Sequence, residues 1–218
     1  MHRHSRIPQL AFAFPASPLS AATHAQVQDA PRWTFSRLVV RSRHHKRIVE
    51  RLERARPHFP ELDGLAIRVG LVKKRGILGW GSLDPEQPGI WVRPLRLDLF
   101  TLAHEFTHLL QARTLVPSGE RACDLYALAR APELIDHMPS YLIIPDMLRR
   151  LDAVPMVLQH QLCGAARTAI AAREAGDRRY IQRFETLVRE ACERDGMAPS
   201  VAAEAHAELY DENIALAT

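Results

Sequence analysis

Residues 97–112 read LDLFTLAHEFTHLLQA, and this stretch decides how the rest of the chain is interpreted. Its apolar side chains recur at intervals of three and four residues, which predicts one helix with a continuous apolar stripe. Asp98 precedes the stripe and can cap the start of the helix. His104 and His108 lie on a flank of the stripe rather than at its centre. The sequence therefore predicts a partly buried helix that presents two histidines along one side.

The pattern His-Glu-x-x-His within this helix predicts a zinc site. His104 and His108 are four residues apart, so both rings project from one side of the helix and can bind a single Zn²⁺. Glu105 lies roughly 100° around the helix, where it can accept a proton from a metal-bound water. We therefore expect two histidine ligands and a glutamate that acts as general base in the hydrolysis of amide bonds.

A catalytic zinc requires a third protein ligand and an open position. Glu120 opens the next predicted helix, over 119–131, which can fold back antiparallel to the first. Asp124 follows one turn later and can accept the free N–H of a ligating histidine. We expect Glu120 to be the third ligand, and Asp124 or His137 in that role are the alternatives. Cys123 is expected to face away from the two carboxylates as a small buried hydrophobic residue.

Hydrolysis of an amide also needs a hydrogen-bond donor that points at the developing oxyanion. The candidates for this donor are Tyr126, Tyr141, His160 and Tyr180. Tyr141 is preferred because it follows the helix that is expected to carry the third ligand.

Residues 101–111 (TLAHEFTHLLQ), followed by Glu120-x-x-x-Asp124 on a second helix, resemble the gluzincin clan of zinc metallopeptidases. In that clan the first motif supplies two histidine ligands and the general base. A Glu-x-x-x-Asp motif supplies the third ligand and its hydrogen-bonding partner. Only eleven residues separate His108 from Glu120. Residues 119–145 are also similar to small uncharacterised prokaryotic metallopeptidases. The resemblance covers residues 65–145 and implies a minimal member with a zincin-like fold, a Zn²⁺ cofactor and a peptide or protein substrate.

The segments around the motif predict an α+β fold. Short apolar segments over 65–71, 76–82 and 90–92, separated by glycine and proline turns, predict a small antiparallel sheet packed on the histidine-bearing helix. Residues 36–58 predict a basic amphipathic helix, and 145–214 predict a mostly helical C-terminal part.

Residues 1–31 are expected to form a disordered extension, because they lack helical or strand periodicity and prolines interrupt their only apolar run. The remainder is expected to form one metallohydrolase domain. Its parts are a basic helix (32–60), the small sheet (61–96), the metal-binding helices (97–131) and a helical part (132–218).

Charge and composition narrow the expected partners. The chain carries a net charge of +4, and residues 1–60 hold eleven Lys and Arg against three Asp and Glu. Ile48, Val49, Leu52 and Ala55 recur at helical spacing in this basic segment, which favours packing on the body over nucleic-acid binding. Nucleic-acid binding through 36–58 is not favoured, since no aromatic residues interleave the charges. No apolar run approaches the ~20 residues that cross a bilayer, so no membrane partner is expected.

Three cysteines without a CxxC pattern indicate a reducing compartment, so we expect a cytoplasmic protein, with secretion the less favoured alternative. The expected function is zinc-dependent cleavage of peptide bonds. Three alternatives stay open: a zinc hydrolase of a small amide or ester, a DNA-associated protease, and a non-catalytic interaction protein stabilised by a metal. A structural site of the last kind would be closed by four protein ligands.

Overall fold

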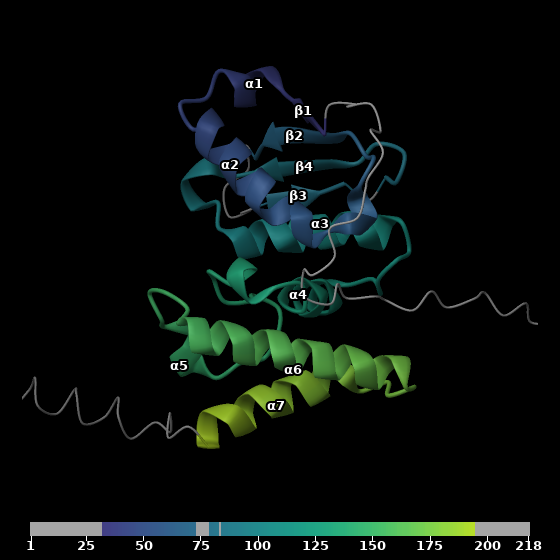
Figure 1. Cartoon of the computed structure of the whole chain (residues 1–218), viewed down its shortest axis with the longest axis vertical. Coiled ribbons are helices and arrows are strands. Elements are labelled where there is room, and N and C mark those ends of the chain that lie inside the picture. Colours follow the sequence, from purple (N-terminus) through teal and green to yellow (C-terminus); the bar gives the residue numbers. More distant parts are fainter. Residues whose placement is uncertain (1–31, 73–78, 83, 195–218) are drawn as a thin grey trace, which may run out of the picture.

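The computed structural model describes residues 32–72, 79–82 and 84–194. Within these residues the fold is α+β, with a four-stranded sheet and seven α-helices. Helix α3 (Leu99–Ala112) lies between the sheet and the helices of the C-terminal half (Figure 1). The expected extension over 1–31 lies outside the described residues.

The sheet is mixed, so the prediction of an antiparallel sheet was wrong. Its strand order is β1 (Trp33–Phe35), β2 (Ile67–Leu71), β4 (Gly89–Val92) and β3 (Gly79–Gly81). β1 and β4 both pair parallel with β2, and only β3 and β4 are antiparallel. The alternation of apolar residues marks strands but does not set their order, and here β4 lies between β2 and β3.

The segment 32–60 is not a single basic helix. It contains β1, then α1 (Arg37–Val40), α2 (His45–Ala55) and a 3-10 turn over Arg56–His58. The strand was missed because three residues are too short for an alternating pattern to be recognised. The expected packing of α2 is confirmed, since Ile48, Leu52 and Ala55 are fully buried, whereas Val49 is only partly buried.

Helix α3 is fixed at its first turn by two carboxylates. The Asp98 side chain accepts a hydrogen bond from the Thr101 amide at 2.5 Å, which confirms the expected cap. Asp136, from a distant segment, accepts from the Leu99 amide at 2.8 Å and also pairs with Arg51 of α2 at 2.6 Å. Negative charge at a helix N-terminus is stabilising, so these contacts fix the position of the helix that carries both histidines.

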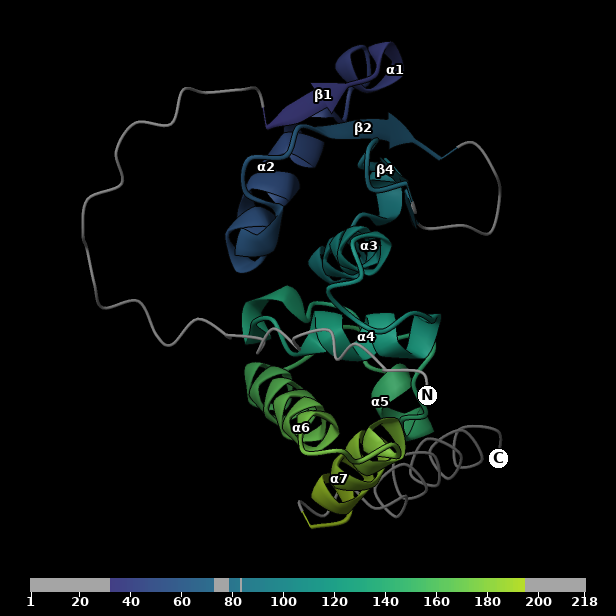
Figure 2. The ribbon, with the colours of Figure 1, turned by 90° about the vertical axis from the view of Figure 1, so that its right-hand side faces the viewer.

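The C-terminal half is helical, as expected, as far as Arg194. Its helices are α4 (Glu120–Leu128), α5 (Asp146–Arg149), α6 (Met156–Glu174) and α7 (Tyr180–Arg194). Figure 2 shows α4 on one side of α3 and the sheet on the other. In the described ranges no helix combines the length and the apolar composition that a membrane span requires.

Candidate metal centre

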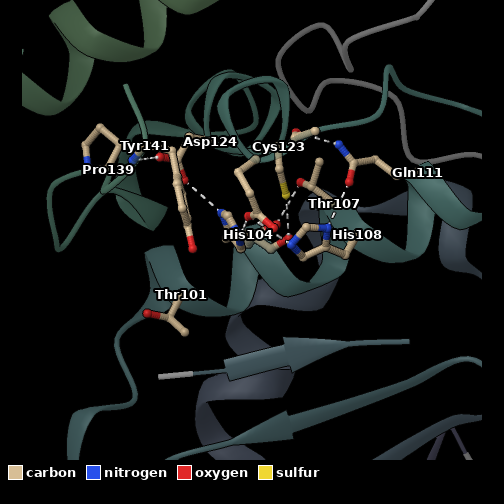
Figure 3. Close-up of polar contacts among 12 residues, drawn as sticks. Thr101, His104, Thr107, His108, Gln111, Cys123, Asp124, Pro139 and Tyr141 are labelled. Atoms are coloured by element: carbon tan, nitrogen blue, oxygen red, sulfur yellow. Dashed lines mark hydrogen bonds and ion pairs between the residues drawn. The ribbon is translucent and has the colours of Figure 1, made fainter. Parts of the chain in front are cut away.

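The side chains of His104 and His108 project from α3 toward α4 (Figure 3), where both contact Glu120. The Nε2 atom of His104 lies 3.2 Å from Oε2 of Glu120, and Nε2 of His108 lies 3.4 Å from the same oxygen. The two rings meet edge to face, with centroids 4.7 Å apart. The turn between the helices thus brings Glu120 onto the side of α3 that carries the histidines.

Both imidazoles are oriented through their other nitrogen. Nδ1 of His104 lies 2.8 Å from Oδ1 of Asp124, and Nδ1 of His108 lies 2.8 Å from Oε1 of Gln111. The Gln111 amide nitrogen donates in turn to the carbonyl of Pro117 at 2.7 Å. Because each Nδ1 faces an oxygen acceptor, the neutral tautomer with its proton on Nδ1 leaves a lone pair on Nε2. In that tautomer both Nε2 atoms can serve as metal ligands.

Asp124 joins the histidine pair to the segment that carries Tyr141. Its carboxylate is buried, and Oδ2 accepts a hydrogen bond from the Tyr141 amide at 2.7 Å. The Tyr141 ring stacks on the His104 ring at 5.8 Å. Burial, together with the nearby carboxylates, raises the pKa of Tyr141, so its hydroxyl keeps its proton and remains a donor at neutral pH.

The segment around Tyr141 is held by contacts with two further helices. Arg149 of α5 donates to the Leu142 carbonyl at 2.7 Å, and Glu185 of α7 accepts from the Ile143 amide at 2.8 Å. These bonds fix backbone groups on the C-terminal side of Tyr141 while its own ring remains half exposed. The C-terminal helices therefore position one wall of the site.

Glu105 is a buried carboxylate beside the two histidines. Only 4% of its surface is exposed, and its Oε2 atom has no hydrogen-bond partner within the described residues. The pKa of Glu105 is raised to about 7. Burial is the main cause of this increase, the neighbouring His104 opposes it, and Glu120 adds to it. A carboxylate held in this way can gain and lose a proton near neutral pH.

Strand β3 approaches Glu105 so closely that only glycine fits. A Cβ on Gly79 would lie 2.2 Å from Oε1 of Glu105, and a Cβ on Gly81 would lie 2.8 Å from Cβ of His108. The glycines therefore allow the edge strand to lie directly against the side of α3 that carries the motif. The sequence showed these glycines, but their role depends on the packing of β3 against α3.

A cleft of about 410 Å³ opens over these groups. This volume lies within the range of ~300–1,000 Å³ that is usual for ligand sites. Its lining includes the residues Gly79, Trp80, Phe100, Thr101, His104, Glu105, His108, Glu120, Asp124, His137, Met138, Ser140 and Tyr141. The expected ligands, the expected base and the preferred oxyanion donor thus share one cleft.

The other candidate donors lie elsewhere. Tyr126 is buried and contacts Arg173 of α6, and Tyr180 also lies beside Arg173. His160 is exposed on α6, where its Nδ1 lies 2.9 Å from the Met156 carbonyl. None of these three residues lines the cleft.

Cys123 lies beside the two histidines, a proximity that was not expected from the sequence. It is buried as expected, and its donor atom and those of His104 and His108 all lie within 4.8 Å of one another. Its Sγ atom donates to the His104 carbonyl at 3.1 Å. Burial raises the pKa of the Cys123 thiol, so in the protein without metal the sulfur stays protonated.

The two alternative third ligands, Asp124 and His137, occupy positions different from that of Glu120. Asp124 lies on Nδ1 of His104, the nitrogen that points away from Glu120. His137 lines the same cleft, whereas Glu120 is the residue whose carboxylate contacts the Nε2 atoms of both His104 and His108. No role was expected for Gln111, although its spacing of three residues from His108 places both side chains on one side of the helix.

Comparisons of the chain with protein-family models, with curated proteins and with solved structures found no match. The site is therefore interpreted from its own residues and geometry.

Replacing Asp124 by alanine is expected to weaken zinc binding by about 10–100-fold, because His104 loses the partner that orients its ring. The dissociation constant can be measured by competition with a chromophoric chelator. Asp152→Ala, at an exposed position, is the matched control and should bind zinc like the unaltered protein. Equal zinc affinity in the two variants would show that Asp124 does not support the metal.

Proposed function

We propose that this protein is a zinc-dependent metallopeptidase with a zincin-like fold. One observation carries the proposal: Nε2 of His104, Nε2 of His108 and Oε2 of Glu120 converge in an open cleft. The buried carboxylate of Glu105 lies beside them with one oxygen unpaired among the described residues. Helix α3 carries the two histidines and Glu105, and it packs directly against the edge strand β3. This arrangement supports a zincin-like fold.

The donor set suits zinc in both chemistry and spacing. Neutral imidazole nitrogens and a carboxylate oxygen are usual zinc ligands, at about 2.0–2.2 Å from the ion. Two such donors on a tetrahedral ion lie about 3.4 Å apart, which agrees with the 3.2 Å and 3.4 Å found between Glu120 and the two histidines. When bound, zinc would act as a Lewis acid on a carbonyl and on water.

The protein's own residues supply the remaining steps. Glu105 would accept a proton from the attacking water and deliver it to the leaving amine. The Tyr141 hydroxyl would donate a hydrogen bond to the oxygen that becomes negatively charged. Asp124 and Gln111 hold the two imidazoles in place, so the ligands need little reorganisation during the reaction.

A polypeptide substrate is favoured by the position of β3. This strand pairs with β4 on one side and forms an edge of the sheet, and its residues Gly79 and Trp80 line the cleft. An extended peptide can add to such an edge through main-chain hydrogen bonds. The peptide would then pass over Glu105, which lies against Gly79.

A non-catalytic metal site is the second candidate, and the position of Cys123 is the observation that favours it. If the Cys123 sulfur also bound the ion, the metal would have four protein ligands and no open position. We favour the catalytic site because Sγ is directed at the His104 carbonyl, whereas Glu120 already contacts both Nε2 atoms.

The proposal is tested with the purified protein loaded with one equivalent of zinc. We expect it to cleave an unfolded test protein, to lose that activity with 1,10-phenanthroline, and to regain it when zinc is restored. A preparation that holds stoichiometric zinc and cleaves neither unfolded protein nor a mixture of blocked peptides would contradict the proposal.

A further inference from the structure

The sheet has one face on the core and a second face on which Gly70, Gly89, Trp91 and Trp80 lie, with Arg68 beside them. Side chains alternate along a strand, so Ile90 and Val92 of β4 are buried in the core while Trp91 lies on the other face. Gly70 and Gly89 form the floor under its indole. A Cβ would lie 2.3 Å from the Trp91 ring at Gly70 and 3.1 Å from it at Gly89. The Trp91 indole therefore lies over Gly70 and Gly89, and a side chain at Gly70 would clash with it.

Trp91 supports a second tryptophan at the edge of the sheet. Trp80 of β3 is the direct neighbour of Trp91 across the strand pair, and the two ring centroids are 4.7 Å apart. Aromatic pairs at this separation are attractive beyond the area that they bury. Trp80 nevertheless remains 58% exposed, and it lines the same cleft as Glu105.

The neighbours of Trp80 determine what a bound peptide would meet there. In an extended peptide added to the edge of β3 that pairs with no strand among the described residues, side chains would alternate between the two faces of the sheet. Those on the α3 face would lie next to Gly79 and Gly81. Those on the opposite face would lie beside the exposed indole of Trp80. Across paired strands, an aromatic side chain interacts favourably with an aromatic or β-branched neighbour.

We propose that Trp80, which packs against Trp91, is a specificity-determining residue. It selects peptides that place an aromatic or large aliphatic side chain next to its indole. This inference rests on the proposed peptidase function, because it takes the edge of β3 as the place where substrate binds. The contact with Trp91 makes the subsite selective, because it already holds the Trp80 indole in one position. An indole that already lies against Trp91 loses little conformational freedom when a second apolar side chain packs on it.

The test measures binding rather than turnover. Cleavage of a random peptide mixture first identifies the sequences that the protein cuts. End-blocked peptides of these sequences are then synthesised with either Phe or Ala at one position at a time. Their affinities for zinc-loaded Glu105→Gln protein are measured by fluorescence anisotropy. We expect the Phe peptide to bind about tenfold more tightly than the Ala peptide, which is about 1.4 kcal/mol. Adding Trp80→Ala should abolish this difference, and Trp80→Phe should restore most of it.

Leu38→Ala is the matched control, because Leu38 is similarly exposed at 53% but does not line the cleft. It should leave the preference for Phe unchanged. Equal binding of Phe and Ala peptides at every position, or a preference that survives Trp80→Ala, would overturn the inference. Dependence on Trp80 for a nucleic acid or a saccharide, without a peptide preference, would overturn it as well.

The two proposals fail in distinguishable ways. If cleavage mapping finds no cut site, the binding measurement uses one six-residue peptide instead. Each of its positions in turn is occupied by Phe or by Ala. Selective, Trp80-dependent binding without cleavage would contradict the peptidase function and support the subsite. Cleavage by the unaltered protein without any preference at a Trp80-dependent position would support the function and overturn the subsite.

Discussion

Replacing Glu105 by glutamine is expected to lower peptide hydrolysis by about 10²–10⁴-fold while zinc content and fold are retained. Glutamine has nearly the same shape as glutamate but cannot accept a proton at its amide. Glu105 is 4% exposed and contacts β3, so a substitution that preserves shape is needed to separate chemistry from packing. The measurement is kcat/KM on a blocked peptide, with zinc determined on the same preparation.

Glu190→Gln provides the matched control, because Glu190 is exposed on α7, away from the cleft. It should hydrolyse the peptide at the unaltered rate. If zinc-loaded Glu105→Gln retained the full rate, Glu105 would not be the general base.

Replacing Phe106 by alanine is expected to destabilise the protein by about 3–5 kcal/mol. Phe106 is fully buried within the histidine motif of α3. Its ring stacks on Trp33 of β1 at 6.0 Å and meets Phe59 edge to face at 5.2 Å. Removing the ring leaves a cavity between the first strand and the helix that carries the site. Denaturant unfolding followed by far-UV circular dichroism gives the change in free energy.

Leu95→Ala is the control for that measurement, because Leu95 is 66% exposed in a 3-10 turn. It should change the stability by less than about 0.5 kcal/mol. A loss below ~1 kcal/mol for Phe106→Ala would mean that α3 is not packed against β1 as described.

The features that the sequence predicted correctly are local ones. α3 was predicted as a helix because its apolar period and its Asp98 cap lie within sixteen residues. The joint position of His104 and His108 follows from helical spacing alone. Glu120 was expected near them because a short loop returns α4 to α3, and the structure brings these side chains together.

The features that the sequence missed depend on contacts between distant segments. Strand direction was mispredicted because β4 pairs parallel with β2 and antiparallel with β3, and no local sequence pattern records that choice. Asp136 anchors the start of α3 from 37 residues away. The proximity of Cys123 to the histidines was not predicted because it depends on how α4 packs on α3, which brings Sγ to the His104 carbonyl.

The identity of the metal ligands is tested most directly by zinc K-edge X-ray absorption and elemental analysis of three proteins: unaltered, Glu120→Ala and Cys123→Ala. We predict one zinc per chain in the unaltered protein and in Cys123→Ala, with only nitrogen and oxygen neighbours at about 2.0–2.2 Å. Zinc content should fall sharply in Glu120→Ala. Full zinc retention in Glu120→Ala, or a sulfur neighbour at about 2.3 Å in the unaltered protein, would contradict a catalytic site formed by His104, His108 and Glu120.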